Sequence, residues 1–501
     1  MKINPFRFAQ LYFFRLLFVF SKGKRSIKYF NLEYCATFYS TLFDRKFYKA
    51  QLTKDSNFIE NSKVDLVEHY VKTGWKLGFN PSLGFDNDAY IQKHQEIIKS
   101  NESPLYNFVI HRGQKGYFRL KIDKTPYSQV VYPSLETFSP FSKSILIISH
   151  ELTNTGAPIV MVQLARALKE LGYNVVIICP FNGPLKEKLI ELGFLVIIDE
   201  YFFIKMQLKR PSTIDFVKRF SLLWFNTCVY GNFCQYVPTG IKTVCWAHEG
   251  VEFLSKTPYD LRDLNSFIKV FSVSAYVKKN LLDFSSITSE ILYYGIDLFE
   301  FEKVFNNHFQ NKQIISLNVH KLTFCSVGSF YYRKGMDIFV SYIDSLPKDL
   351  KAKCKFEIIG KNGDNTVISP KLLKRNPQLS VLGELSHEET LKHILDCDVL
   401  VCISRDDPFP TTISEAAAYK KVIMCSKNVG QYDLIKDQIT GLKVNCAQDF
   451  ENAVSYVVNN YDKLYPMAEK FSYQYLPLID YNNFKKNVLG IVSDLLDTKC
   501  E

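Results

Sequence analysis

Short, uninterrupted apolar segments recur along most of the chain and constrain its fold more than any other feature. One series begins at "SILIISH" (144–150) and continues through "NVVIICP", "FLVIID", "LLWFNT", "KTVCWAHE" and "KVFSVS". A second series begins at "LTFCSVGS" (322–329) and continues through "FEIIGKNG", "LSVLGEL", "DVLVCIS", "KVIMCS" and "GLKVN". Such runs, separated by helical patterns, are typical of parallel strands buried on both faces. We therefore predict an α/β chain with two Rossmann-like domains that face a central cleft.

The whole chain has 501 residues, which allows further regions beside these two domains. The motif "FDRKFY" (43–48) recurs as "FDNDAY" (85–90), and each copy opens a helix–link–helix pattern in which Gly74 and Gly113 are expected to end helices. Asp86 and Asp88 have the spacing of a metal-binding D-x-D motif, but their place at the start of a repeat favours a helix N-cap. The expected organisation is a basic aromatic segment (1–30), a small helical repeat region (31–125), two Rossmann-like domains (140–310 and 315–475) and a C-terminal helix (476–501).

Basic residues are concentrated at the N-terminus. The net charge is +11, and residues 1–32 hold seven lysines and arginines without an acid. The aromatic and basic character predicts a helix on the anionic inner face of a membrane, or else a helix docked on the protein's own core. Arg7 and Arg15 interrupt the apolar stretch, so a membrane span is not expected. The segment has no signal-peptide cleavage site, and no nucleic-acid motif is present, so a cytoplasmic protein without a nucleic-acid partner is expected. The 12 cysteines lack zinc-ligand spacing and several lie in strand-like runs, which indicates small buried side chains in a reducing compartment.

The loops after the predicted strands hold the candidate site residues of the first domain. Gly156 precedes a helix, whose free amides would attract a phosphate, although the glycine could also simply make the turn. His248 ends an apolar strand, with Glu249 after it, where it could be either structural or functional. Asp297 could cap the next segment or reach the cleft. No G-x-G-x-x-G follows a strand, which argues against a dinucleotide oxidoreductase.

The second domain has three such loops. Arg333 and Lys334 are adjacent cations before a glycine, which suit a diphosphate leaving group or a solvated turn. Gly360 and Gly363 would let a loop approach a nucleotide or merely make a turn. In "RDDPFPTTISEA" (405–416) two acids lie eight residues apart across a turn stiffened by prolines.

The two acids, Asp407 and Glu415, could bind hydroxyl groups of one ligand. A helix that begins at Thr411 or Thr412 would aim its amides at the same place. The alternative is a capping box from Thr412 to Glu415, in which Glu415 serves only the helix end.

Taken together, these motifs resemble the GT-B glycosyltransferases, and family 4 (retaining, group 1) in particular. The resemblance rests on Asp407-PFPTTIS-Glu415 and its continuation to "ITGL", on "HKLTFCSVG" with "SVGSFYYRKGMD", and on "SAYVKKNL" followed by "YYGID". It covers residues 144 to about 475, and the repeat at 43–118 resembles a helical region of some bacterial members. This chain has Asp407 where the family more often has Glu, and Thr155-Gly156 where many relatives have two glycines.

The resemblance implies a metal-independent hexosyltransferase that moves a sugar from a nucleoside-diphosphate sugar, with retention, to a glycan or lipid-linked acceptor. The domain at 140–310 would hold the acceptor and the domain at 315–475 the donor. In this scheme the catalytic residues are His248, Asp407 and Lys334. The implied donor-binding residues are Gly156, Ser329, Arg333, Lys334, Gly360, Pro410, Thr411, Thr412 and Glu415.

Three interpretations follow, and we take the first as the working hypothesis. It is a transferase of surface polysaccharide biosynthesis (capsule or lipopolysaccharide), cytoplasmic or peripheral at the inner face of a bacterial membrane. The second is another GT-B enzyme, such as a nucleotide-sugar epimerase or a phosphorylase. The third is a non-catalytic protein that binds a nucleotide sugar or acts as a scaffold. The sugar, the base and the acceptor do not follow from the sequence.

Overall fold

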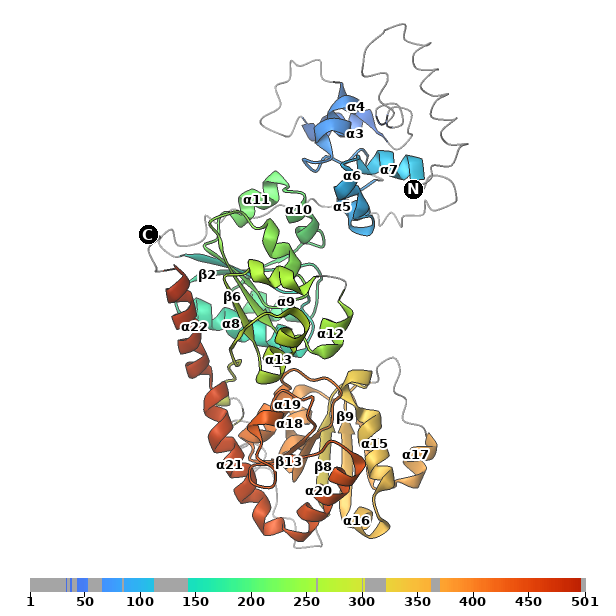
Figure 1. Ribbon diagram of the computed structural model, residues 1–501, viewed down its shortest axis with the longest axis vertical. Helices are drawn as coiled ribbons and strands as arrows, with labels where there is room; N and C mark the ends of the chain where they lie inside the picture. Colours follow the sequence, from blue (N-terminus) through green and yellow to red (C-terminus); the bar gives the residue numbers. More distant parts are fainter. Residues whose placement is uncertain are drawn as a thin grey trace. The chain divides into compact units, whose positions relative to one another are not determined.

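The computed structural model describes residues 33, 37, 43–52, 65–82, 85–111, 143–257, 260–299, 301, 321–361 and 370–496. The chain divides into two compact units. Unit 1 takes its residues from Met1–Thr137, Ile197–Arg219 and Tyr236–Gly240. Unit 2 takes its residues from Phe138–Val196, Phe220–Gln235 and Ile241–Glu501, and it contains most of the strands (Figure 1).

The first sheet has the strand order β3-β2-β1-β4-β5-β6-β7, and its strand pairs from β2 to β7 are parallel. We call this sheet and its helices the first lobe. Its strands are β1 (Ser144–Ile148), β2 (Asn174–Cys179), β3 (Leu195–Ile198), β4 (Leu222–Phe225), β5 (Lys242–Ala247), β6 (Lys269–Ser272) and β7 (Glu290–Ile291). Its helices are α8 (Gly156–Glu170), α9 (Leu185–Glu191), η3 (Gly231–Tyr236), α12 (Val251–Lys256), η4 (Leu261–Ser266) and α13 (Ala275–Ser285).

The second sheet has the order β10-β9-β8-β11-β12-β13, and all of its strand pairs are parallel. With its helices it forms the second lobe. Its strands are β8 (Leu322–Val327), β9 (Cys354–Ile359), β10 (Leu379–Gly383), β11 (Val399–Cys402), β12 (Val422–Cys425) and β13 (Leu442–Lys443). The helices that follow them are η5 (Tyr332–Lys334), α15 (Met336–Ser345), α16 (Lys348–Ala352), α17 (Pro370–Arg375), α18 (His387–Asp396), α19 (Thr411–Ala418), η6 (Tyr432–Leu434), α20 (Ala447–Asn459), α21 (Tyr461–Ile479) and α22 (Tyr481–Leu496).

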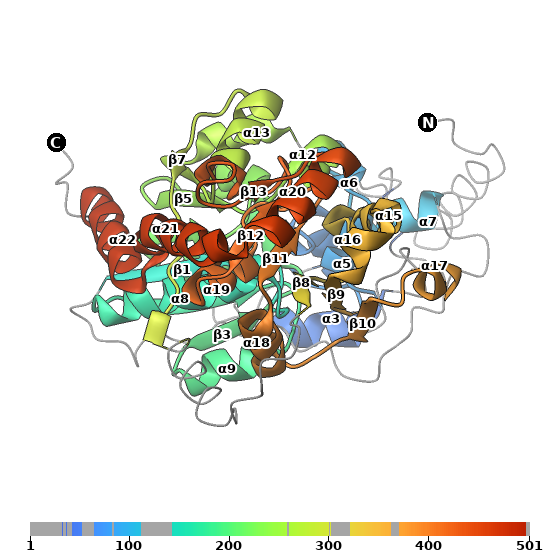
Figure 2. The same cartoon turned by 90° about the horizontal axis from the view of Figure 1, so that it is seen from below.

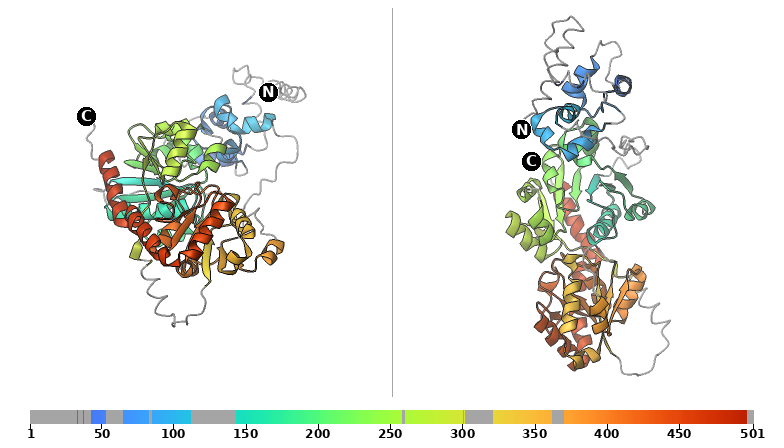
Figure 3. Two further views of the ribbon diagram at one scale, coloured as in Figure 1. Left: turned by 60° about the horizontal axis from the view of Figure 1, so that its bottom comes forward. Right: turned by 90° about the vertical axis from the view of Figure 1, so that its right-hand side faces the viewer.

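Both sheets have the doubly wound topology that the sequence predicts. In each, the first strand pairs with the second on one side and with the fourth on the other, so the winding direction reverses between β1 and β4 and between β8 and β11. Helices lie on both sides of each sheet (Figure 3). The carboxyl ends of the strands at such a reversal are where ligands bind in open α/β sheets.

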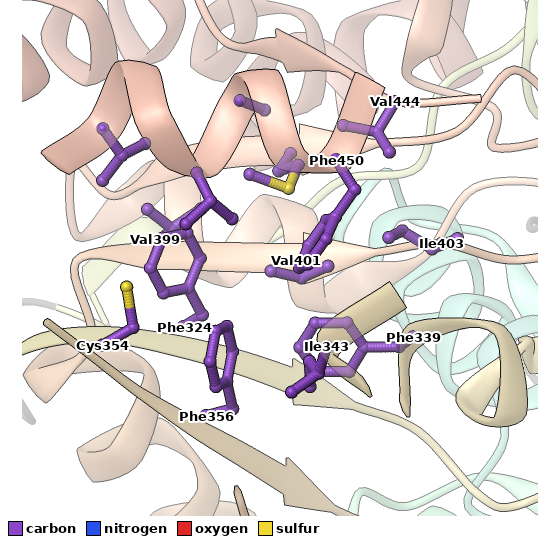
Figure 4. Close-up of a cluster of buried hydrophobic side chains, with 14 of the residues drawn as sticks. Phe324, Phe339, Ile343, Cys354, Phe356, Val399, Val401, Ile403, Val444 and Phe450 are labelled. Carbon is purple, nitrogen blue, oxygen red and sulfur yellow. The ribbon is translucent and has the colours of Figure 1, made fainter. Parts of the chain in front are cut away.

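Aromatic side chains fill the core of the second lobe (Figure 4). Phe324 stacks on Phe356 with ring centroids 5.3 Å apart, and Phe339 meets Phe356 and Phe450 edge to face. Cysteines also lie in the cores, as the sequence predicts: within the described residues Cys446 is exposed and the other cysteines are buried.

The last two helices connect the lobes. In the second lobe α21 packs on α19 (Figure 2). The Ser472 hydroxyl of α21 donates to the Ala417 carbonyl of α19 at 2.6 Å. Helix α22 packs on the first lobe, where Tyr481 donates to Glu170 of α8 at 2.9 Å and Phe484 stacks on Trp246 with ring centroids 5.7 Å apart. The C-terminal helices therefore return the chain from the second lobe to the first.

Unit 1 is helical. Its elements are α3 (Arg45–Leu52), α4 (Leu66–His69), η2 (Tyr70–Gly74), α5 (Asn87–Lys93), α6 (Glu96–Ser100), α7 (Pro104–His111), α10 (Phe202–Gln207) and α11 (Pro211–Val217). Asp86 is the N-cap of α5 and accepts from the Ala89 amide at 2.9 Å, so the predicted cap is confirmed. The prediction that Gly74 caps a helix is wrong. Gly74 is the last residue of the π-helix η2, whose C-cap is Trp75, and a Cβ on Gly74 would lie 1.7 Å from the Tyr48 hydroxyl, so the glycine serves close packing.

A buried arginine joins two of the sequence segments of unit 1, Met1–Thr137 and Ile197–Arg219. Arg210, just before α11, is 2% exposed and donates to Asp88 at 2.6 Å and to the Trp75 carbonyl. Ile204 of α10 belongs to the same hydrophobic cluster as the N-terminal helices. Helix α10 therefore completes the core of the repeat region, and Arg210 ties the start of α11 to it.

Three predictions lie outside the described residues: the membrane-surface helix in 1–30, the cap at Gly113 and the loop glycine Gly363. Among the helices of the described part of the chain, none combines the length and the apolar character needed to cross a bilayer.

Candidate active site

The predicted site residues all follow strands at the carboxyl edges of the two sheets. Gly156 comes after β1 and His248 after β5 in the first lobe. In the second lobe Ser329 to Lys334 follow β8, Gly360 follows β9, and Asp407 to Glu415 follow β11. Strands β1, β8 and β11 border the two winding reversals.

Asp407 and Lys334 form a largely buried ion pair. The Lys334 ammonium donates to Asp407 Oδ2 at 2.7 Å, and the two side chains are 18% and 6% exposed. Arg333 Nη1 lies 4.0 Å from the other carboxylate oxygen, and its side chain is 38% exposed. Lys334 is therefore not part of a solvated turn, and the one carboxylate is shared by two cations.

The loops that carry these charges are tied together through the backbone. The Arg333 carbonyl accepts from the amides of Arg405 and Asp406 at 2.8 and 3.1 Å. Arg405 also makes a bidentate ion pair with Asp337, at 2.7 and 2.6 Å. The cationic loop after β8 and the acidic turn after β11 therefore form one structural element.

Helix α19 begins at Thr411, and its N-cap is Pro410 without a side-chain capping bond. The capping-box interpretation of Glu415 is therefore wrong. Glu415 is the fifth residue of α19, is 8% exposed and has Oε1 3.2 Å from His387 Nε2. Thr411 and Thr412 are half-buried at the start of the helix. Because Glu415 does not cap the helix, its buried carboxylate is open to another role, and binding the hydroxyl groups of a ligand is one that a carboxylate can fill.

Gly360 permits a close approach between two loops. Its Cβ would lie 2.0 Å from the Gly328 carbonyl and 3.1 Å from the Ser329 amide. The loop after β9 thus packs directly on the loop that carries Ser329. This contact alone accounts for the glycine.

His248 is held in one orientation. Its Nε2 lies 3.3 Å from Asn226 Oδ1, and Asn226 Nδ2 donates to the Ala157 carbonyl at 3.0 Å, so Oδ1 is left to accept from the imidazole. Burial lowers the pKa of His248 to about 4, so the side chain is neutral near neutral pH. The bond through Asn226 also ties the His248 strand to the start of α8, where Gly156 lies.

Glu249 anchors the loop next to His248. It accepts from the Thr227 hydroxyl, from the Cys228 amide at 3.1 Å and from the His248 amide at 2.9 Å. Burial pushes its pKa up, but the nearby His150 and these hydrogen bonds outweigh burial, and the net pKa is lowered. Glu249 is therefore an ionised group that fixes the backbone of His248.

The loop before Gly156 holds a second carboxylate. Glu151 accepts from Thr153 and Thr155 at 2.8 and 2.9 Å. Its contact with His150, together with these bonds, lowers the pKa of Glu151 to about 2. Nothing lies within 4 Å of a Cβ built on Gly156, so packing does not require this glycine.

Asp297 follows β7, and its Oδ2 lies 3.8 Å from Arg166 Nη2 of α8. Its Oδ1 accepts from the Phe299 amide at 3.2 Å, so it caps the segment that follows.

Four residues with roles at these loops were missed from the sequence: Asn226, Glu151, His387 and Asp406. Asn226 follows β4 as "FNT", and its position at a strand end beside the winding reversal was a usable signal. The contact between His387 and Glu415 spans 28 residues and has no local sequence signal.

The topology, the strand-end loops and the returning C-terminal helices define the class of protein: a two-lobed GT-B fold. The model of the glycosyl transferases group 1 matches residues 307–474, and the model of glycosyl-transferase family 4 matches residues 141–251. Together the matches span most of both lobes, and the chain belongs to the group 1, family 4 type of GT-B glycosyltransferases.

Individual relatives are distant. An uncharacterized glycosyltransferase of Methanocaldococcus jannaschii is 24% identical over 202 residues, which is 39% of this chain and 50% of that protein. The chain thus matches about half the length of this curated relative.

Solved structures share the fold at low identity. The HepE protein of Anabaena, in complex with UDP, has a TM-score of 0.57 at 13% identity, over 70% of this chain and 100% of that chain. Sucrose-phosphate synthase of Thermosynechococcus elongatus has a TM-score of 0.55 at 16% identity, over 71% and 100%. A glycosyltransferase of Rickettsia africae has a TM-score of 0.54 at 17% identity, over 72% and 100%.

Proposed function

We propose that this protein is a retaining glycosyltransferase that moves a sugar from a nucleoside-diphosphate sugar to a glycan or lipid-linked acceptor. The observation that carries the proposal is the arrangement of Lys334, Arg333 and Asp407 at the end of β8 and β11. Two cations share one carboxylate there, so the cluster has an excess positive charge at the edge where ligands bind in this topology. A diphosphate is the ligand that such a cluster suits.

In the proposed reaction the bond from the anomeric carbon to the β-phosphate oxygen breaks, and charge develops on the diphosphate. Lys334 and Arg333 would stabilise that charge, since fixed cations act most strongly where charge appears in the transition state. The acceptor hydroxyl would attack from the same face, and its proton would pass to the departing phosphate oxygen. This course retains the anomeric configuration.

The carboxylates would orient the donor. Asp407 Oδ2 is held by Lys334, which leaves Oδ1 to accept from a sugar hydroxyl, and Glu415 would accept from the ribose. The start of α19, at Pro410, Thr411 and Thr412, would contribute helix amides to the phosphates, with Ser329 and Gly360 beside them. In the first lobe, neutral His248 would lie beside the reacting carbon, and the Gly156 loop would approach the phosphates.

We propose that the reaction does not need a divalent metal. Among the described residues, no three His, Cys, Asp or Glu side chains gather in a group that could hold one. The two cations of the second lobe would supply the counter-charge instead.

We propose that the protein takes part in surface polysaccharide biosynthesis in a bacterial cell, as for a capsule or lipopolysaccharide. The basic segment 1–30 supports a peripheral place on the inner face of the membrane, because seven cations without an acid suit anionic lipids. The Anabaena structures are complexes with UDP and with UDP-glucose, which makes UDP the first nucleotide to test here.

Isothermal titration with UDP and GDP in the presence of EDTA tests the donor site. We expect one nucleotide to bind the wild-type protein, and its Kd to rise at least about tenfold in Lys334→Ala and in Glu415→Ala, because each change removes a charged hydrogen-bonding partner. Lys463→Ala, an exposed lysine of α21, is the matched control and should bind as the wild type does. Equal binding by all variants would place the nucleotide elsewhere.

A further inference from the structure

Asp406, next to Asp407, makes its contacts with the other lobe. Its side chain is not aimed at the cationic loop: Oδ2 accepts from the Glu252 amide at 2.7 Å and Oδ1 accepts from the Tyr276 hydroxyl at 2.9 Å. Both partners belong to the first lobe, at the starts of α12 and α13. Asp406 is 6% exposed, so these two bonds satisfy a carboxylate that is largely out of water.

A glycine on the first lobe makes room for this carboxylate. A Cβ on Gly250 would lie 1.9 Å from Asp406 Oδ1 and 2.4 Å from its carboxyl carbon. Gly250 has φ −94° and ψ −171°, which is extended backbone that any residue adopts. The close approach of Asp406, and not the backbone conformation, is therefore what requires a glycine here.

A third hydrogen bond lies beside the two that Asp406 accepts. The Ser274 hydroxyl, which is the N-cap of α13, donates to the Pro408 carbonyl at 2.6 Å. Residues 406–408 of the second lobe thus contact the starts of two helices of the first lobe.

These contacts link the two loops that the proposed chemistry needs. Gly250 is two residues from His248, and Asp406 is adjacent to Asp407. The distance between His248, beside the reacting carbon, and Asp407, which would bind the donor sugar, must be fixed closely. A misplacement of about 1 Å can lower the rate a hundredfold.

We propose that Asp406 is a positioning residue that latches the His248 loop of the first lobe to the Asp407 turn of the second. The latch rests on the proposed function, since it positions the two halves of that site. Asp406 touches neither the donor nor the acceptor in this scheme, and it acts through the two loops that it joins.

Hydrogen–deuterium exchange tests the latch without any substrate. In Asp406→Ala we expect the peptide that contains the Glu252 amide to exchange about tenfold to a hundredfold faster, because that amide loses its charged acceptor. Tyr276→Phe removes one of the two bonds and should give a smaller increase at the same peptide. Asp283→Ala, an exposed acid of α13, is the control and should leave this peptide unchanged. Unchanged exchange at Glu252 in Asp406→Ala would overturn the latch.

A double-mutant cycle separates the latch from a general loss of stability. Gly250→Ala should speed exchange at Glu252 in the wild-type background, because the methyl group displaces Asp406. In the Asp406→Ala background the same change should have no further effect. Additive effects of the two changes would show that they act independently, and would overturn the proposal.

Catalytic readouts then distinguish positioning from donor binding. Asp406→Ala should bind UDP with the wild-type Kd and release UDP from UDP-glucose roughly a hundredfold more slowly in kcat, and Asp406→Asn, which keeps one acceptor oxygen, should recover part of the rate. A wild-type rate in Asp406→Ala would contradict the positioning role. If the wild-type protein does not bind UDP, only the assignment of a uridine donor is contradicted. The latch is tested separately, by the hydrogen–deuterium exchange comparison.

Discussion

Replacing Lys334 with alanine is expected to lower kcat by about 10²- to 10³-fold, the size of effect seen when one fixed donor to a developing negative charge is removed. Lys334 is the more buried of the two cations, and its ammonium group is held 2.7 Å from Asp407. Its position is therefore set before any donor binds, which is the condition under which a cation stabilises a leaving diphosphate most. The rate of UDP or GDP release from the donor that the protein turns over measures the effect.

One further variant separates the effect of the positive charge of Lys334 on kcat from the effect of the shape of its side chain. Lys334→Arg keeps the charge but replaces a compact ammonium with a planar fork, and it should recover only part of the lost rate. Lys463→Ala on α21 should retain the wild-type rate. A rate for Lys334→Ala within a few-fold of the wild type would contradict the assigned role of this residue.

Arg210→Met is expected to destabilise unit 1 by about 3 kcal/mol, because it leaves Asp88 and the Trp75 carbonyl without the cation that now reaches them. Hydrogen exchange should rise about a hundredfold in 65–82, in 85–111 and in 201–217 together. Peptides of the second sheet, such as 354–359, should keep their wild-type rates.

Lys218→Met, an exposed residue at the end of α11, is the matched control for that change. Faster exchange in 201–217 without a change in 65–111 would mean that α10 and α11 are not part of the repeat unit. Hydrogen exchange of the double variant Arg210→Met/Asp88→Asn should indicate a smaller loss of stability than the sum of the losses in the two single variants, since the two residues form one ion pair.

The fold was predictable where burial alone sets the pattern. Strands such as Ile145–Ile148 and Val399–Cys402 are buried on both faces, so their apolar runs are continuous and stand out from the helices around them. The short strand β7 was missed because Glu290 and Ile291 are both exposed at the sheet edge. The helices α10 and α11 were missed as part of the repeat unit because the contact that places them, from Arg210 to Asp88, spans 122 residues.

The residue types of the candidate site were also predictable, but their pairing was not. Adjacent cations after one strand and spaced acids after another can be found by position in a doubly wound sheet. That Lys334 and Asp407 form a buried ion pair depends on how two loops pack. Asp406 shows most clearly what the sequence does not predict, because nothing in the sequence distinguishes it from Asp407. In the structure the Asp407 carboxylate accepts from Lys334, whereas the Asp406 carboxylate accepts from the Glu252 amide.

Product analysis with a panel of UDP- and GDP-linked sugars, in EDTA, with and without a membrane lipid extract as acceptor, tests whether this protein is a retaining glycosyltransferase. We expect that one donor releases its nucleoside diphosphate, that the acceptor extract speeds this release, and that nuclear magnetic resonance shows the transferred sugar in its original anomeric configuration. Conversion of the sugar while it stays attached to its nucleotide would indicate an epimerase instead. Tight binding of one donor with no product from any acceptor would contradict a transferase and favour a binding or scaffold protein.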